Sequence, residues 1–183
     1  MAESPSRVNI TNLVADHHRA VYQYAYRLTG SVPEAEDLTQ HVFLAAQRNL
    51  GKLHKLESAR QWLYAILRNR FLKEKQKHWP LPAADLQLDM EDVPDTQLPE
   101  TAIDREQLQA ALNRLPDDSR LVLVMFYFEE SSYREIAEQL QLPIGTVMSR
   151  LARAKARLRS ILFRAEADGR AQPSNGGLAS LAK

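Results

Sequence analysis

The sequence contains no cysteine among its 183 residues. This absence excludes disulfide bonds and thiolate metal sites, and it is consistent with a reducing compartment. No apolar run approaches the roughly 18 residues that a membrane-spanning helix needs, and the polar N-terminal stretch lacks the apolar region of a signal peptide. We therefore expect a cytoplasmic protein without membrane insertion.

Motifs that would indicate catalysis are also missing. The sequence has no glycine-rich phosphate loop, no nucleophile motif, and no HExxH or other paired metal spacing. The histidines are scattered, and His17 falls on the apolar side of the first expected helix, so a partly buried structural histidine is the ordinary interpretation. A metal-dependent enzyme is thus a weak alternative, and we expect no catalytic residues, no metal and no cofactor.

The net charge of the chain is close to zero, with a formal value of only +1 at pH 7. The distribution of charge is more informative than the sum. Basic residues dominate 48–77, acidic residues dominate 85–106, and no acidic residue occurs between Gln141 and Ala165. The alternation predicts two nucleic-acid surfaces joined by an acidic connector.

No segment alternates convincingly as a β-strand does, so the fold class we expect is all-α. Capping boxes, in which a serine and a residue three positions later bond to each other's backbone N–H, mark helix starts at Ser31 and Ser58. Gly30 is expected to end the first helix, and the apolar run LVLVMFYF is interpreted as a buried helix. The expected helices cover about 11–29, 31–50, 58–79 and 101–115, followed by one that begins at Pro116.

Residues 132–164 have the pattern of a helix–turn–helix with a basic second helix. Ser132 and Glu135 form a capping box, Pro143 interrupts the helical pattern, and Thr146 is expected to cap the second helix. Cations gathered on one helix without acidic neighbours suit a phosphate backbone, although a solvated charged face is the plainer alternative. The outer side of this helix carries Arg150, Arg153, Lys155, Arg157, Arg159 and Arg164.

The chain is expected to hold two small helical domains. A three-to-four-helix bundle covers 10–78, and the helix–turn–helix domain covers 101–164. Between them, 79–100 is rich in proline and acid, which predicts a flexible linker able to span roughly 70 Å. Residues 165–183 are expected to form a disordered tail.

Two separate motifs now carry a family resemblance. The stretch SYREIAEQLQLPIGTVMSRLARAKARLR, together with EAEDLTQHVFLAAQR, a basic loop and QWLYAILRNRFLKEKQK, resembles bacterial sigma factors of the sigma-70 family, extracytoplasmic-function (ECF) group. The resemblance implies a promoter-specificity subunit that binds core RNA polymerase, recognises the −35 and −10 elements and helps to open DNA. It also implies a regulatory partner, often an anti-sigma factor.

The resemblance assigns roles to residues of the first domain. The second helix is expected to dock on the polymerase clamp through Asp37, Gln40, His41 and Leu44, with His41 replacing the usual acidic residue. Unpaired bases need cations along the backbone and a stacking surface, and Trp62 is open to either stacking or core packing. The expected −10 contacts are Lys52, His54, Lys55, Arg60, Trp62, Arg68, Asn69, Lys73 and Lys77.

In the second domain the resemblance places the basic helix in the major groove of the −35 element. An arginine can pair with guanine through two hydrogen bonds, which discriminates by about 1–3 kcal/mol. Met148 replaces a residue that is basic in many relatives. A methionine cannot bond to a phosphate, so this position would recognise bases through apolar contacts, or the helix would bind DNA more weakly. The expected −35 contacts are Thr146, Met148, Ser149, Arg150, Arg153 and Arg157.

Two other classes of function remain open from the sequence. A helix–turn–helix transcriptional regulator would explain the second domain, but it leaves the basic surface at 48–77 and the acidic helix at 34–41 without a role. A helical protein that binds polymerase without DNA is the other alternative. Electrophoretic mobility shift with and without core polymerase distinguishes these classes from a sigma factor.

Overall fold

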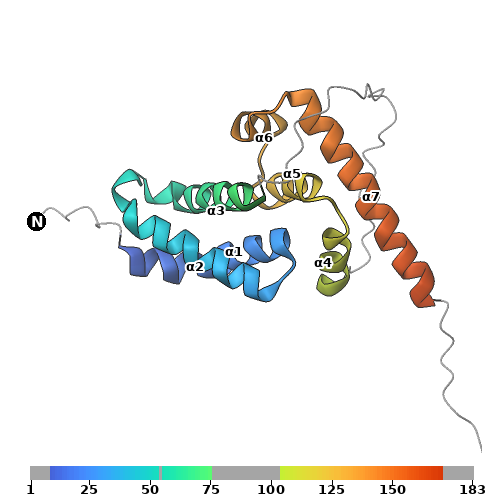
Figure 1. Ribbon diagram of the computed structural model, residues 1–183, viewed down its shortest axis with the longest axis horizontal. Coiled ribbons are helices and arrows are strands. Elements are labelled where there is room, and N and C mark those ends of the chain that lie inside the picture. The colour runs from blue at the N-terminus through green and yellow to red at the C-terminus, as the bar shows by residue number, and fades with distance from the viewer. Residues whose placement is uncertain (1–8, 54, 76–103, 171–183) are drawn as a thin grey trace, which may run out of the picture.

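The computed structural model describes residues 9–53, 55–75 and 104–170, and these ranges contain helices and turns but no strand (Figure 1). The expected all-α class and the arrangement in two small helical domains are confirmed. His54, Lys77, the linker at 79–100 and the end of the tail, 171–183, lie outside the described residues.

The N-terminal bundle consists of three helices, α1 (Ile10–Thr29), α2 (Val32–Arg48) and α3 (Ala59–Lys75), with 3-10 turns at Leu50–Lys52 and Leu56–Ser58. Gly30 ends α1 as expected, in the left-handed conformation at φ 70°. The capping box expected at Ser31 is wrong, because its side chain makes no capping hydrogen bond. The Thr29 hydroxyl lies at this junction, where it donates to the Ala25 carbonyl group at 3.0 Å and accepts from the Ser31 N–H at 3.4 Å.

The bundle is held together by one apolar side of each helix. Burial of one large apolar side chain contributes about 1.5–3 kcal/mol, so a shared core of this size dominates the stability of the bundle. The buried residues include Val21, Tyr24 and Leu28 of α1, Leu38 and Val42 of α2, and Leu63, Leu67 and Phe71 of α3.

The C-terminal domain contains α4 (Arg105–Asn113), α5 (Asp117–Phe128), α6 (Tyr133–Leu140) and α7 (Ile144–Arg170). The apolar run is a helix, α5, as expected. Its residues 121–125 are all buried, and α5 packs against α7. A helix buried on nearly all sides explains why the run shows no polar face.

The helix–turn–helix itself follows the sequence closely at its first helix. The capping box is confirmed, since the Glu135 N–H donates to Ser132 Oγ at 3.3 Å and the Ser132 N–H donates to Glu135 Oε2 at 2.8 Å. The expected cap at Thr146 is wrong, because α7 begins at Ile144. The carbonyl group of Pro143 already accepts from the N–H groups of Thr146 and Val147, so the helix starts directly after the proline.

The far end of α7 also differs from the expectation. The helix continues to Arg170, so 165–170 are helical where a disordered tail was expected to begin. Alanine at 165 and 167 and glutamate at 166 are strong helix formers, which favours continuation of the helix over a stop at 164.

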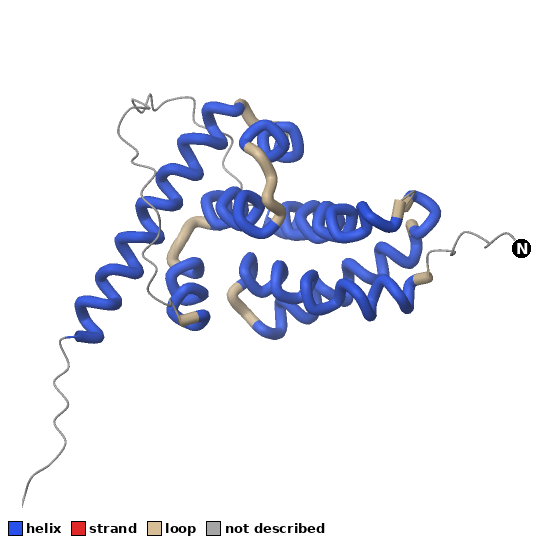
Figure 2. Tube along the Cα trace, turned by 180° about the vertical axis from the view of Figure 1, so that it is seen from behind, coloured by secondary structure: helices blue, strands red, loops and turns tan. Residues whose placement is uncertain are grey.

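The two domains pack directly against each other. The α5 helix lies next to α1 and α3, and α4 lies next to the end of α1 (Figures 1 and 2). The packing creates one continuous set of buried residues that runs through both domains. Sequence patterns had predicted the two domains but not this contact.

Candidate nucleic-acid interface

One side of α2 is polar and exposed. Asp37, Gln40 and Leu44 are exposed, and Leu44 keeps 51% of its surface accessible. The His41 Nδ1 lies 2.9 Å from the Asp37 carbonyl oxygen and 3.2 Å from its carboxylate. Spacings of three, four and seven residues put all four on one side of the helix, opposite the core. This surface, called the α2 face below, is free to meet a partner.

Basic side chains surround the entry to α3. Lys52, Lys55 and Arg60 are exposed. The Arg60 Nε donates to the Tyr64 hydroxyl at 3.0 Å, and its guanidinium lies 5.4 Å from the centre of the Tyr64 ring. Tyr64 is buried, so it fixes one edge of the Arg60 guanidinium group, while Arg60 as a whole stays exposed. Three cations on a short segment form a surface suited to a nucleic-acid backbone.

A second row of side chains runs along α3. Trp62, Asn69 and Lys73 are spaced by seven and four residues, which places them on one side of the helix. Asn69 and Lys73 are exposed. Trp62 is half-buried and packs against the core, which favours its structural role while leaving part of the residue accessible. We call Asn69, Lys73 and the exposed basic residues 52, 55 and 60 the α3 face.

Arg68 does not belong to that exposed set in this structure. Its Nη1 lies 2.8 and 2.9 Å from the two carboxylate oxygens of Glu129, at the end of α5, and both side chains are only 6% exposed. The Tyr24 hydroxyl donates to the same carboxylate. Burial, and then the negative charge of Glu129, raise the pKa of Tyr24 well above its ordinary value. The predicted −10 contact is therefore engaged in an ion pair between the two domains.

The exposed cations of α7 lie beyond its first turn. Arg153 and Arg157 are exposed and four residues apart, so they project from the same side. The Arg153 Nε donates to the Ser149 carbonyl group at 3.2 Å, and the Ser149 hydroxyl donates to that of Thr146 at 3.1 Å. Thr146, Ser149 and the predicted contact Met148 are half-buried. We call this side of α7 the α7 face.

Arg150 is placed differently from its neighbours. It is 7% exposed, and its Nη1 lies 3.6 Å from the Asp118 carboxylate at the start of α5. Lys155, another cation of the outer side, lies 4.7 Å from the centre of the Phe126 ring. Both therefore join α7 to α5. Asp118 lies far from Arg150 in the sequence, so helical spacing did not indicate it as the partner of Arg150.

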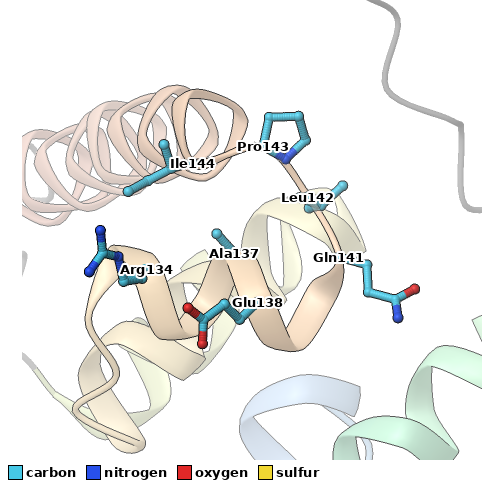
Figure 3. Close-up of a pocket in the computed structure, with 7 residues that line it drawn as sticks. All are labelled: Arg134, Ala137, Glu138, Gln141, Leu142, Pro143 and Ile144. Atoms are coloured by element: carbon cyan, nitrogen blue, oxygen red, sulfur yellow. The ribbon is translucent and has the colours of Figure 1, made fainter.

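An open depression lies at the turn between α6 and α7 (Figure 3). Ile144 is 49% exposed at its edge, next to Arg134 and Glu138 of α6. The remaining lining residues are Ala137, Gln141, Leu142 and Pro143.

The described residues contain no group of three histidine, cysteine, aspartate or glutamate side chains placed to hold a metal ion. In the same ranges, no helix has the length and apolarity to cross a membrane.

Two family models match the chain. The model described as sigma-70 region 2 matches residues 13–80, and the one described as sigma-70, region 4 matches residues 105–158. The first match contains α2 and α3, and the second contains the helix–turn–helix. The α2 and α3 faces and the α7 face thus lie in the two matched regions.

Named relatives agree with these matches. The chain is 35% identical over 158 residues to the ECF RNA polymerase sigma factor SigW of Bacillus subtilis, which covers 78% of this chain and 82% of the relative. It is 35% identical over 155 residues to the ECF RNA polymerase sigma factor SigE of Mycolicibacterium smegmatis, covering 82% of this chain and 60% of the relative.

Among solved structures, the chain is similar to the sigma factor RpoE in complex with the anti-sigma factor NepR from Bartonella quintana. The TM-score is 0.61 at 25% identity, covering 84% of this chain and 96% of the other. The structure of CnrH with the cytosolic domain of CnrY gives a TM-score of 0.54 at 25% identity, covering 85% and 88%. With both regions matched and relatives above 30% identity over most of the chain, the protein belongs to the ECF group of sigma-70 family sigma factors, the promoter-specificity subunits of bacterial RNA polymerase.

Proposed function

We propose that each of the three faces of this sigma subunit binds a different partner, and that the α2 face binds core RNA polymerase. On α2, the buried residues and the exposed polar residues occupy opposite sides, and a half-exposed Leu44 lies among Asp37, Gln40 and His41. An apolar side chain with a polar rim is the usual composition of a protein interface. This surface would contact the clamp region of the polymerase.

The α3 face is proposed to hold the −10 element as a single strand. Lys52, Lys55 and Arg60 supply positive charge for the backbone, and the exposed Asn69 amide can donate to and accept from one base at once. Lys73 extends the charge along the helix. His54 and Lys77 remain predictions of the sequence for the same surface.

The α7 face is proposed to read the −35 element as a duplex. Thr146, Ser149, Arg153 and Arg157 lie on one side of α7, since they are three or four residues apart in succession. Met148, in the first turns of the helix, remains a predicted contact on a different side. A helix with this composition fits the major groove, where arginine distinguishes guanine. Arg150 is expected to act mainly through the domain fold, because it is buried against Asp118.

The remaining proposals concern the setting of the protein. We place it in the cytoplasm, where RNA polymerase works, and expect a subunit without enzymatic activity or cofactor of its own. The solved structure of RpoE in complex with the anti-sigma factor NepR supports an anti-sigma factor as a partner of this chain too.

The observation that carries the proposal is the exposure of Asn69 and Lys73 on one side of α3, together with that of Arg153 and Arg157 on one side of α7. The test is run-off transcription with purified core polymerase on a library of promoters. Transcripts that start at a shared pair of −35 and −10 sequences support the proposal. Sequence-specific operator binding by the free protein, with no transcription, would instead indicate a regulator.

A further inference from the structure

Ile144 is an exposed apolar residue at the start of α7, the helix that is proposed to read the −35 element. It keeps 49% of its surface accessible. A single exposed apolar residue is common on proteins, but Ile144 has apolar neighbours on the surface. Pro143 before it is exposed, and Met148, four residues later on the same side of the helix, is half-buried. The start of α7 therefore carries an apolar strip, which consists of Pro143, Ile144 and Met148.

This apolar strip borders the depression at the turn between α6 and α7. Arg134 and Glu138 of α6 are exposed and line the same depression. Figure 3 shows the side chains of Arg134 and Ile144 at the same edge of it. A cation beside an apolar side chain suits duplex DNA, which offers phosphates at the rim of a groove and methyl groups inside it. The carboxylate of Glu138 would repel a phosphate, so we expect the phosphate on the Arg134 side.

Gly145 indicates independently that another molecule approaches this point. It is exposed, it has no positive φ, and a Cβ added to it would meet nothing within 4 Å. The free protein therefore does not need a glycine here, although glycine is the least favourable helix residue apart from proline. A residue without a side chain lets a ligand come close to the backbone. The glycine is thus explained by a bound partner and not by the fold.

The dimensions of a helix and of the major groove bring the apolar strip to the base edges. An α-helix with its side chains is about 10–12 Å across, and the major groove is about 12 Å wide. A helix whose first turns enter the groove therefore fills it, and side chains on two of its sides reach base edges. Thr146 and Ser149 would occupy one side, and Ile144 and Met148 the other.

Thymine is the base that an apolar side chain selects in the major groove. Its C5-methyl group is the only methyl group that the base pairs present there. The remaining groups are mostly hydrogen-bond donors and acceptors, and isoleucine would cover them without offering a partner. Burial of one methyl group against Ile144 would raise the affinity for DNA about fourfold.

We propose that Ile144 is a specificity-determining residue, which recognises a thymine of the −35 element through contact with its C5-methyl group. Met148 extends the apolar contact, Gly145 admits the DNA, and Arg134 holds the neighbouring phosphate. The inference rests on the proposed −35 role of the α7 face and adds the base that this end of the helix selects.

The test removes the methyl group from the DNA and the side chain from the protein, separately and together. Holoenzyme made from the full chain and core polymerase binds duplex fragments that carry the −35 sequence found by run-off transcription. Each thymine of that element is replaced in turn by deoxyuridine, which lacks only the methyl group. The protein variants are Ile144→Ala and the conservative Ile144→Val. Val32→Ala is the control, because Val32 is 48% exposed at the start of α2.

Filter binding measures the affinity of each protein for each fragment. With the wild type, deoxyuridine at the thymine that meets Ile144 is expected to weaken binding about fourfold. Ile144→Ala should bind the thymine fragment at least as weakly, and it should not distinguish thymine from deoxyuridine at that position. The two changes are then not additive, as expected for groups in contact. Ile144→Val should keep part of the difference, and Val32→Ala should keep all of it.

Gly145→Ala tests the close approach of the DNA. Alanine favours a helix and its Cβ meets nothing in the free protein, so the midpoint of thermal unfolding should stay the same or rise. Binding to the −35 fragment should weaken all the same. A substitution that preserves the fold but impairs binding identifies a contact with DNA, and unchanged binding would show that the backbone stays away from it.

The proposal is overturned if Ile144→Ala still distinguishes thymine from deoxyuridine wherever the wild type does. It is also overturned if the wild type is insensitive to every methyl group, or if the selected −35 element contains no A·T pair. An equal loss for all fragments would assign the apolar strip to a protein contact instead. Failure of the −35 assignment is distinguishable, because Arg153→Ala would then leave the affinity for the duplex unchanged. If this inference alone fails, the loss in Arg153→Ala remains.

Discussion

Arg68 and Glu129 are 61 residues apart in the sequence, and their charged groups lie 2.8 Å apart between two domains. Removing one partner of such a pair leaves the other as a buried, uncompensated charge, which is more costly than the absence of the whole pair. The domains are therefore coupled in stability, and single substitutions at either position affect both.

Tyr24 should make the free energy of unfolding depend on pH in the alkaline range. Its folded pKa is raised by burial and then by Glu129, so the neutral phenol is favoured in the folded state. The stabilisation is fully present below the unfolded pKa of about 10 and is lost as the pH rises above it toward the folded pKa. We expect Tyr24→Phe to show a shallower fall of the unfolding free energy above pH ~10, measured by urea denaturation.

The control for this prediction is Tyr127→Phe, since Tyr127 is 46% exposed on α5. It should keep the wild-type slope. Equal slopes in all three proteins would show that Tyr24 does not titrate with folding.

The α2 face is expected to tolerate substitution in the free protein but not in the polymerase complex. Asp37→Arg combined with Gln40→Ala should change the unfolding free energy by no more than about 0.5 kcal/mol, because both side chains are exposed. Binding to core polymerase should weaken by several kcal/mol if the face is an interface. Co-purification with core enzyme measures this. Glu106→Arg, an exposed charge reversal on α4, is the control, and an equal loss there would contradict the assignment.

Substitution of Arg150 should lower the stability of the protein, whereas substitution of Arg153 should lower its affinity for DNA. Arg150→Ala is expected to lower the unfolding free energy by about 1–3 kcal/mol, since it leaves Asp118 without its partner in a largely buried site. Arg153→Ala should leave stability unchanged and reduce affinity for the −35 duplex by about 1–3 kcal/mol if it pairs with guanine. Uniform loss across sequences, with a salt slope smaller by about one, would identify a phosphate contact.

Thermal unfolding and filter binding of the holoenzyme separate these two effects. A stable Arg150→Ala protein with weakened DNA binding would show that Arg150 leaves Asp118 to reach the groove.

Asn69→Ala is expected to impair strand opening while leaving closed-complex binding nearly unchanged. Its exposed amide is proposed to hold an unpaired base rather than a duplex edge. Permanganate footprinting reports opening, and filter binding on duplex and pre-melted bubble templates reports capture. A bubble removes the cost of unpairing, so it should rescue the variant only in part. Gln61→Ala, an exposed amide elsewhere on α3, is the control, and equal behaviour of both variants would refute the −10 pocket.

Local patterns predicted much of the fold because the forces involved are local. Ser132 and Glu135 are three residues apart, and a capping box needs nothing else. The apolar side of α2 follows the same rule, since Leu38, Val42 and Ala46 recur at helical spacing in the sequence and are buried in the structure. The residues of the α2 face were assigned by resemblance, and the structure leaves them exposed.

The rest depended on contacts between distant segments. Helical spacing already places Arg68 on the buried side of α3, four residues after Tyr64 and three before Phe71, and Arg150 on the buried side of α7, three residues after Val147. What spacing could not give is the partner of each arginine. Glu129 and Asp118 lie on other segments of the chain, and only the packing of the helices brings them to Arg68 and Arg150. The predicted cap at Thr146 was wrong for a more local reason, because the Pro143 carbonyl group already accepts the first backbone hydrogen bonds of α7.

Because α7 is long, its far end moves farthest when the second domain changes its orientation. Its 27 residues correspond to a rod of about 40 Å at 1.5 Å per residue. A turn of the domain by about ten degrees would sweep the far end of such a rod through about 7 Å. Small angular changes at the junction are thus magnified at the C-terminal end, so a molecule that binds that end can act strongly on the orientation of the second domain.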